Sequence, residues 1–119
     1  MPTFREKSTG GHFKGKDPTV QVDKLRENWI DDALVLNIGK AGPKKGRTLK
    51  KRLKEYIRFG HGTPVGHRGG RYIWQLGEAN DLLVCWRVLP DVDPESFEKG
   101  LILAFENVYD RMPFANLRH

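Results

Sequence analysis

The residues best suited to chemistry in this sequence are two cations and one acid that lie far apart along the chain. Lys40 follows Gly39 at the end of an apolar run, and Arg52 lies in a basic segment with helical spacing. No acidic residue occurs between Ala33 and Lys54, so positive charge is concentrated in this part of the chain. Such a concentration favours a phosphate group, which a guanidinium can bind through two parallel hydrogen bonds.

The acid is Glu98, in a segment whose apolar residues recur at helical spacing. These apolar residues are Phe97, Leu101, Ala104, Phe105 and Val108. At about 100° per residue, Glu98 points close to the centre of this stripe. A carboxylate on an inward face is costly unless a cation or a metal ion pairs with it. We therefore predict that a basic group such as Arg52, or a metal ion, meets Glu98 in a functional site. The alternative is that Glu98 only forms a salt bridge with Arg52 or another cation, or reaches to the rim of the apolar face.

Helices, strands and a tail must bring these residues together. Helical spacing and capping residues predict helices at about 22–29, 49–59 and 94–109, with Thr48 and Asp93 as N-caps. Short apolar runs predict strands at 33–38, 71–76 and 82–88, the last two forming a hairpin. An extended tail at 112–117 closes the chain. The resulting expectation is an α/β domain of the α+β type, a small, mainly antiparallel sheet flanked by helices.

Length and composition predict a single globular domain. The 119 residues suffice for one core over 1–119, and we expect the glycine- and lysine-rich segment 1–18 to be poorly structured or partly ordered. A hydrophobic content of 38% argues against a disordered chain. The net charge of +6 favours nucleic acid as partner, although a generic basic protein has the same signature.

Cysteine usage and hydropathy bear on the compartment. The single cysteine, Cys85, rules out an internal disulfide, and its apolar neighbours predict a buried position. No apolar run approaches the roughly 18–20 residues that span a bilayer, and the N-terminus lacks the apolar core of a signal peptide. We expect a cytoplasmic protein without a membrane partner.

Histidine and tryptophan residues carry weaker signals. The histidines do not have the spacing of a zinc site. His67, in a glycine-rich loop, is either a plain loop residue or a contact to phosphate. Trp74 and Trp86 are predicted as core residues rather than base-stacking platforms. Gly39-Lys40 lacks the spacing of a nucleotide-binding phosphate loop.

The order of these motifs resembles the GIY-YIG nuclease superfamily, in the version found in the N-terminal domain of the bacterial excision-repair nuclease subunit. The matching pieces are Ile38-Gly39-Lys40-Ala41, Leu49-Lys50-Lys51-Arg52-Leu53 with Tyr56, Glu98 before Leu101-Ile102, and Pro113-Phe114-Ala115-Asn116. The resemblance covers about residues 34–117, and only the combination of pieces is specific. It implies a GIY-YIG-like fold and metal-assisted hydrolysis of DNA phosphodiester bonds.

The resemblance also implies a role for each matching residue. Glu98 would hold Mg²⁺ or another divalent cation, which polarises the phosphate. Arg52 would clamp the phosphate, Lys40 would assist, and Asn116 would orient the site. Asn37 occupies the position of the tyrosine in the second motif. The expected contacts to nucleic acid are Lys44, Lys45, Arg47, Lys51, His67 and Arg68.

Two departures from the family pattern reduce the expected activity. Asn37 replaces a tyrosine, and an amide cannot act as a phenol does. The first motif, which carries another tyrosine, is absent before Val35: either the chain begins after that strand or another segment replaces it. We therefore keep two alternatives, a non-catalytic nucleic-acid-binding module, and an interaction subunit whose sheet is completed by a partner strand or by a second copy in a homo-oligomer.

Overall fold

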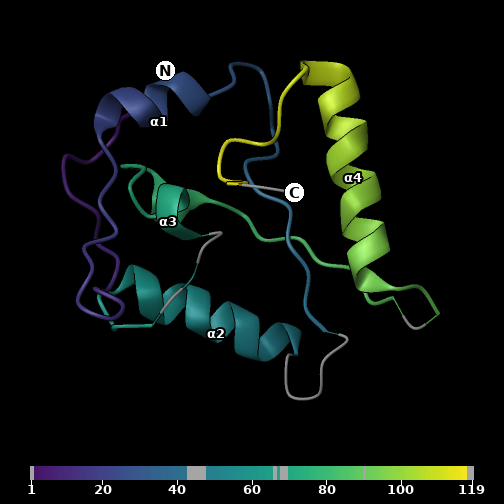
Figure 1. Ribbon diagram of the computed structural model, residues 1–119, viewed down its shortest axis with the longest axis horizontal. Helices are drawn as coiled ribbons and strands as arrows, with labels where there is room; N and C mark the ends of the chain where they lie inside the picture. Colours follow the sequence, from purple (N-terminus) through teal and green to yellow (C-terminus); the bar gives the residue numbers. More distant parts are fainter. Residues whose placement is uncertain (1, 43–47, 66, 68–69, 90, 118–119) are drawn as a thin grey trace.

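The protein is a set of helices joined by long irregular segments. The computed structural model describes residues 2–42, 48–65, 67, 70–89 and 91–117. In chain order its elements are α1 (Val22–Asn28), α2 (Leu49–Gly60), α3 (Gly70–Ile73), the 3₁₀ turn η1 (Ala79–Asp81) and α4 (Pro94–Tyr109). Figure 1 shows α3 near the middle, with α1, α2 and α4 on three sides of it.

The two longest helices, α2 and α4, begin where their capping residues predict. The Thr48 side chain accepts a hydrogen bond from the Lys51 N–H at 3.2 Å at the start of α2. At the start of α4, the Asp93 carboxylate accepts bonds from the Ser96 N–H (3.3 Å) and hydroxyl (2.9 Å). The α4 helix ends at Asp110, which has the left-handed φ of 59°. The predictions of helices at 22–29, 49–59 and 94–109 are confirmed to within one residue at each end.

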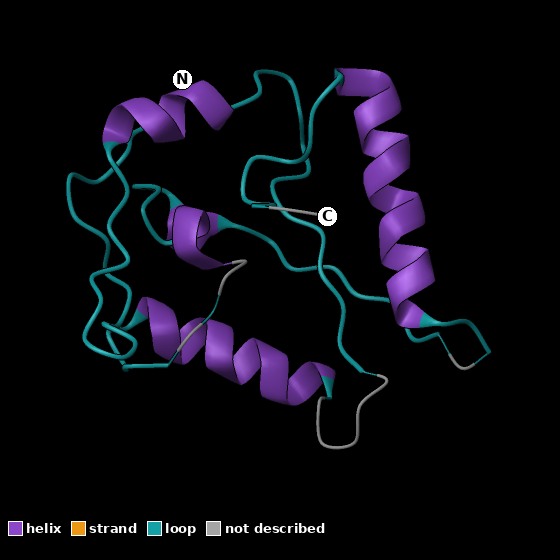
Figure 2. Ribbon diagram, viewed as in Figure 1, coloured by secondary structure: helices purple, strands orange, loops and turns teal. Residues whose placement is uncertain are grey.

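The predicted sheet is wrong for the described residues, which contain no β-strand, as Figure 2 shows. The α/β expectation therefore gives way to a mostly helical chain with loops. Only two isolated bridges occur in the described part, Phe4 with Leu76 and Phe13 with Lys16. The 33–38 run is not a buried strand, because the Leu34 side chain is 97% exposed and its neighbours bond to the C-terminal tail.

The predicted hairpin is also wrong. Residues 71–76 lie in α3 and the turn after it, and side chains 72–76 are all buried in succession. A half-buried strand would bury every second side chain, whereas here consecutive side chains are buried. The apolar run therefore indicated burial correctly, but its buried side chains do not have the spacing of a strand. Residues 82–88 form an extended loop in which Leu83 is 92% exposed and Trp86 67% exposed. Trp86 and Cys85, both predicted as core residues, thus lie at the surface, whereas Trp74 is buried as predicted.

The core forms where α3 and the following turn meet the N-terminal segment, α1, α2 and the C-terminal tail. Its buried hydrophobic members are Leu25, Phe59, Tyr72, Ile73, Trp74, Leu76, Ala79, Phe114 and Ala115. Phe4 and Trp29 pack at its edge and stack against Phe114, with ring centroids 6.1 and 5.3 Å away. The core thus ties both ends of the chain to α3 and fixes the tail that contacts the candidate site.

Gln75 is the buried polar residue of this core, and it links α3 to the N-terminal segment. Its side-chain oxygen accepts the Val20 N–H at 2.9 Å. Its amide nitrogen donates to the carbonyl oxygens of Arg5 (2.9 Å) and Val20 (2.6 Å). Every polar atom of this amide is engaged, so its burial is compensated.

Candidate functional site

Glu98, Lys40 and Arg52 come from three separate segments, and the charges of Lys40 and Arg52 act on Glu98. Glu98 lies in the second turn of α4 and is partly buried. Burial raises the pKa of the Glu98 carboxyl, the positive charges of Lys40 and Arg52 act against that rise, and the negative charge of Glu95 adds to it. A cation affects a carboxyl in this way only when the two lie near each other. The prediction that Glu98 meets Arg52 or a metal ion stays a prediction, and this electrostatic effect supports it.

Lys40 is held in place through the segment just before it. The Asn116 side chain accepts a hydrogen bond from the Ile38 N–H at 2.8 Å and donates one to the Ile38 carbonyl at 2.9 Å. The Ala115 N–H donates to the Leu36 carbonyl at 2.8 Å. These bonds fasten residues 36–38 to the C-terminal tail, which Figure 1 shows beside the segment leading to Lys40. Asn116 therefore positions the site through the backbone.

The N-terminus of α4 lies on the other side of Lys40. The Ser96 hydrogen bonds lower the pKa of Asp93, with a smaller contribution from the positive charge of Lys40. Lys40 Nζ also lies 3.4 Å from the Gly42 carbonyl oxygen, to which it donates. Lys40 is thus placed between the loop that follows it and the acidic start of α4.

Arg52 lies in α2, where it has a neighbour of its own. Its Nη1 lies 4.0 Å from Glu55 Oε2, and both side chains are about one third exposed. An ion pair at this distance and exposure is weak, so the guanidinium stays accessible to a stronger anion such as phosphate.

Tyr56 follows Arg52 by one helical turn and is half-buried. Burial raises the pKa of the Tyr56 phenol, so it stays protonated at neutral pH and cannot serve there as a base. Its ring lies 5.4 Å from that of His67 and 5.1 Å from that of Trp74, centroid to centroid. His67 Nδ1 accepts the Gly70 N–H at 2.8 Å at the start of α3. His67 therefore has a local structural role, on the side of α2 that carries Tyr56.

The positions of the other predicted site residues say less about function. Asn37 is exposed beside the fastened Ile38, and the Lys51 side chain is exposed on α2. The predicted nucleic-acid contacts Lys44, Lys45, Arg47 and Arg68 lie outside the described residues. The sequence did not predict that the Ile38 backbone is the partner of Asn116. It also did not predict the buried role of Gln75, because a single amide within an apolar run forms no recognisable sequence pattern.

The donor set around Glu98 limits how a metal ion could bind. Among the described residues, no group of three or more His, Cys, Asp or Glu side chains is arranged to hold a metal ion. Mg²⁺, however, is commonly held by one or two carboxylates together with waters and substrate phosphates. A partly buried Glu98 beside two cations fits a divalent ion that arrives with a phosphate, and does not fit a cage built from protein alone.

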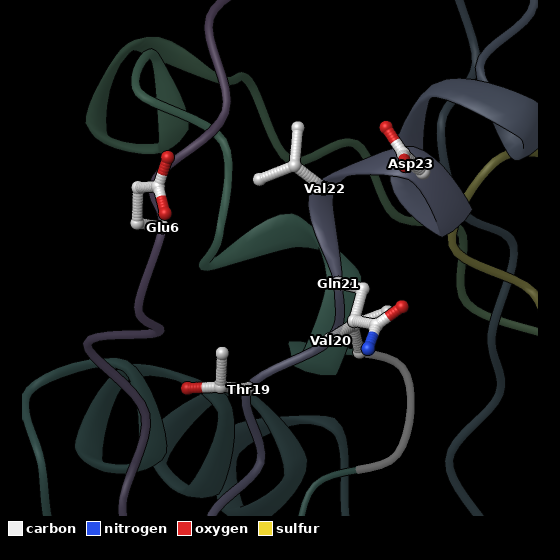
Figure 3. A pocket seen from close by; sticks show the side chains of 6 residues that line it. All are labelled: Glu6, Thr19, Val20, Gln21, Val22 and Asp23. Atoms are coloured by element: carbon white, nitrogen blue, oxygen red, sulfur yellow. The ribbon is translucent and has the colours of Figure 1, made fainter.

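Two hollows in the surface lie among other residues. One, of about 340 Å³, lies between Glu6 and the segment entering α1, and Figure 3 shows Glu6 on one side and residues 19–23 on the other. Another, of about 470 Å³, is an apolar groove along α2 against Trp86. Its lining residues are Leu49, Lys50, Leu53, Lys54, Ile57 and Trp86. Neither hollow is lined by Lys40, Arg52 or Glu98.

Comparisons with known proteins leave the function to be argued from the chain itself. No protein-family model matches the sequence, and the searches of curated proteins and of solved structures found no match. In the described part of the chain, no helix is long and apolar enough to cross a membrane.

Proposed function

We propose that this protein is a cytoplasmic GIY-YIG-like endonuclease that hydrolyses DNA phosphodiester bonds at the surface formed by Lys40, Arg52 and Glu98. The observation that carries the proposal is the bonding of Asn116 to Ile38, which holds the segment before Lys40, together with the charges of Lys40 and Arg52 acting on the partly buried Glu98. The net charge of +6 supports a polyanionic substrate.

The chain's own residues divide the work in this proposal. Arg52 binds two oxygens of the phosphate, and Lys40 adds a second positive charge that offsets the charge developing in the transition state. Glu98 would hold Mg²⁺ together with the phosphate, and a bound ion would supply Lewis-acid polarisation of that group. Asn116 keeps Lys40 in place through Ile38.

A nicking assay tests this function. Supercoiled plasmid is incubated with the protein and Mg²⁺, and the nicked form is quantified. We expect Mg²⁺-dependent nicking that Glu98→Gln and Arg52→Gln each abolish. The matched control is Glu27→Gln, because Glu27 is an exposed acid on α1 whose charge does not act on Glu98. Equal nicking by wild type and both site variants would contradict the proposal.

A non-catalytic nucleic-acid-binding module is the second candidate. It is favoured by the single carboxylate of the site and by the exposed amide Asn37 where the family has a phenol. Salt-dependent DNA binding that Arg52→Gln weakens, without any Mg²⁺-dependent nicking, would select this candidate.

A further inference from the structure

We propose a second contact to nucleic acid at the tip of the N-terminal loop, where Phe13 stacks on an unpaired base and Lys14 and Lys16 bind the adjoining phosphates. This inference rests on the proposed function and specifies the substrate further: a strand with at least one unstacked base. The tip loop is defined as residues 8–19.

The tip loop is closed at its base and built around a tight turn. The Ser8 N–H donates to the Thr19 hydroxyl oxygen at 3.0 Å, which closes the loop. At the tip, the Lys16 N–H donates to the Phe13 carbonyl at 3.1 Å. Lys14 and Gly15 between them both have positive φ, 53° and 74°, the backbone of a type I′ turn. The side chains at the tip are therefore presented on a fixed backbone.

The loop is attached to the C-terminal end of α2. The Gly11 N–H donates to the Phe59 carbonyl at 2.9 Å. Gly10 packs so closely on the Phe59 ring that an added Cβ would lie 2.4 Å from it, and Gly11 approaches the Thr63 carbonyl equally closely. Figure 1 shows this loop at the end of α2. The loop thus starts from the helix that carries Arg52.

The chemistry of the tip suits a nucleic-acid strand. Phe13 is 45% exposed, and Lys14 Nζ lies 5.3 Å from its ring centroid. Within the tip loop Lys14 and Lys16 outnumber Asp17, the only acid there, so the excess charge is positive. An exposed aromatic ring beside cations is the arrangement that binds bases and phosphates without sequence preference.

The length of α2 between Arg52 and the attachment of the loop is compatible with one bound strand. Arg52 and the helix end at Gly60 are eight residues apart, about 12 Å along the axis at 1.5 Å per residue. That length corresponds to roughly three or four nucleotides of a strand at 3.4 Å each. A membrane partner is less suited, because a single exposed phenylalanine offers little apolar area for insertion.

Fluorescence anisotropy on the full chain tests the contact, with a fluorescein-labelled single-stranded 20-mer and the corresponding blunt duplex. We expect Phe13→Ala to weaken binding of the single strand by roughly 5- to 100-fold and binding of the duplex by much less. Lys14→Glu should lower the slope of log K against log salt by about 0.7 for the single strand. The controls are Leu83→Ala, another exposed apolar residue, and Lys24→Glu on α1; neither should change binding beyond twofold.

Each other outcome overturns the inference in an identifiable way. Unchanged binding by Phe13→Ala, in a variant whose circular dichroism and melting match wild type, shows that the tip makes no contact while the proposed function stands. An equal loss on duplex and single strand refutes stacking on an unpaired base. Binding of phosphatidylserine vesicles that Phe13→Ala removes assigns the tip to membranes. Failure of wild type to bind either DNA refutes the proposed function, and this inference with it.

Discussion

Replacing Asn116 with alanine removes the two hydrogen bonds that fasten Ile38 to the C-terminal tail. The Asn116 side-chain oxygen and nitrogen each lie within 2.9 Å of their Ile38 partners. A neutral hydrogen bond of this kind contributes about 0.5–1.5 kcal/mol net, so the pair contributes about 2 kcal/mol. For a domain of this size that loss corresponds to a fall in Tm of roughly 6–12 °C.

Urea unfolding followed by circular dichroism measures this loss. Asn116→Asp keeps an acceptor for the Ile38 N–H but loses the donor, so we expect about half the effect of alanine. The matched control is Asn107→Ala on the exposed part of α4, which should change the free energy of unfolding by less than about 0.5 kcal/mol. If Asn116→Ala is as stable as wild type, the tail does not fasten this segment and the reasoning is refuted.

The same substitution also tests how Asn116 serves the site. Because both ends of its amide are bonded to Ile38, we expect it to influence DNA binding only by positioning Lys40. Asn116→Ala should therefore weaken binding in wild type but have no further effect in a Lys40→Met background. An equal loss in both backgrounds would mean that Asn116 contacts DNA directly.

Three further predictions concern stability. Gln75→Leu leaves buried backbone groups of the N-terminal segment without partners, so we expect the free energy of unfolding in urea to fall by about 3–5 kcal/mol. The surface change Gln21→Leu should leave it nearly unchanged, and equal values for the two variants would contradict the buried network. Gly60→Ala places a Cβ 2.0 Å from the Trp74 ring, so we expect the free energy of unfolding to fall by about 1–3 kcal/mol and the tryptophan fluorescence to shift. Unchanged stability and fluorescence would exclude this contact. Glu98 has a raised pKa, so the folded state binds its proton more tightly than the unfolded state does; the stability this gives is present below about pH 4.3, the ordinary glutamate value, and is lost as pH rises through the folded pKa. Urea unfolding between about pH 4 and 7 should show this loss in wild type and not in Glu98→Gln, and identical pH profiles would refute it.

The helices could be predicted from sequence because their signals are local. Thr48 and Asp93 cap the helices through bonds to residues three positions later, and such bonds depend on few distant contacts. The sheet could not be predicted because an apolar run specifies neither its period nor its partner, and the runs at 33–38 and 82–88 include the exposed residues Leu34 and Leu83. Residues 72–76 satisfy their burial in and after a short helix, and residues 36–38 bond to an asparagine side chain from the end of the chain.

The candidate site could be predicted in part for the same reason. The position of Glu98 on the apolar stripe of α4 is a local property, and it indicated a partly buried acid in need of cations. The roles of Asn116 and Gln75 depend on contacts between residues 78, 55 and 70 positions apart in the chain, which no local pattern encodes.

The central claim is that Lys40, Arg52 and Glu98 share one phosphate-binding surface, and the pKa of Glu98 measured by carbon-13 NMR tests it most directly. The pKa should lie above the ordinary glutamate value in wild type, rise further in Lys40→Met and in Arg52→Met, and stay unchanged in Lys24→Met on α1. Addition of a short DNA duplex should also raise it, because a phosphate brings negative charge beside the carboxyl. A Glu98 pKa that ignores both cations and the DNA would contradict the claim.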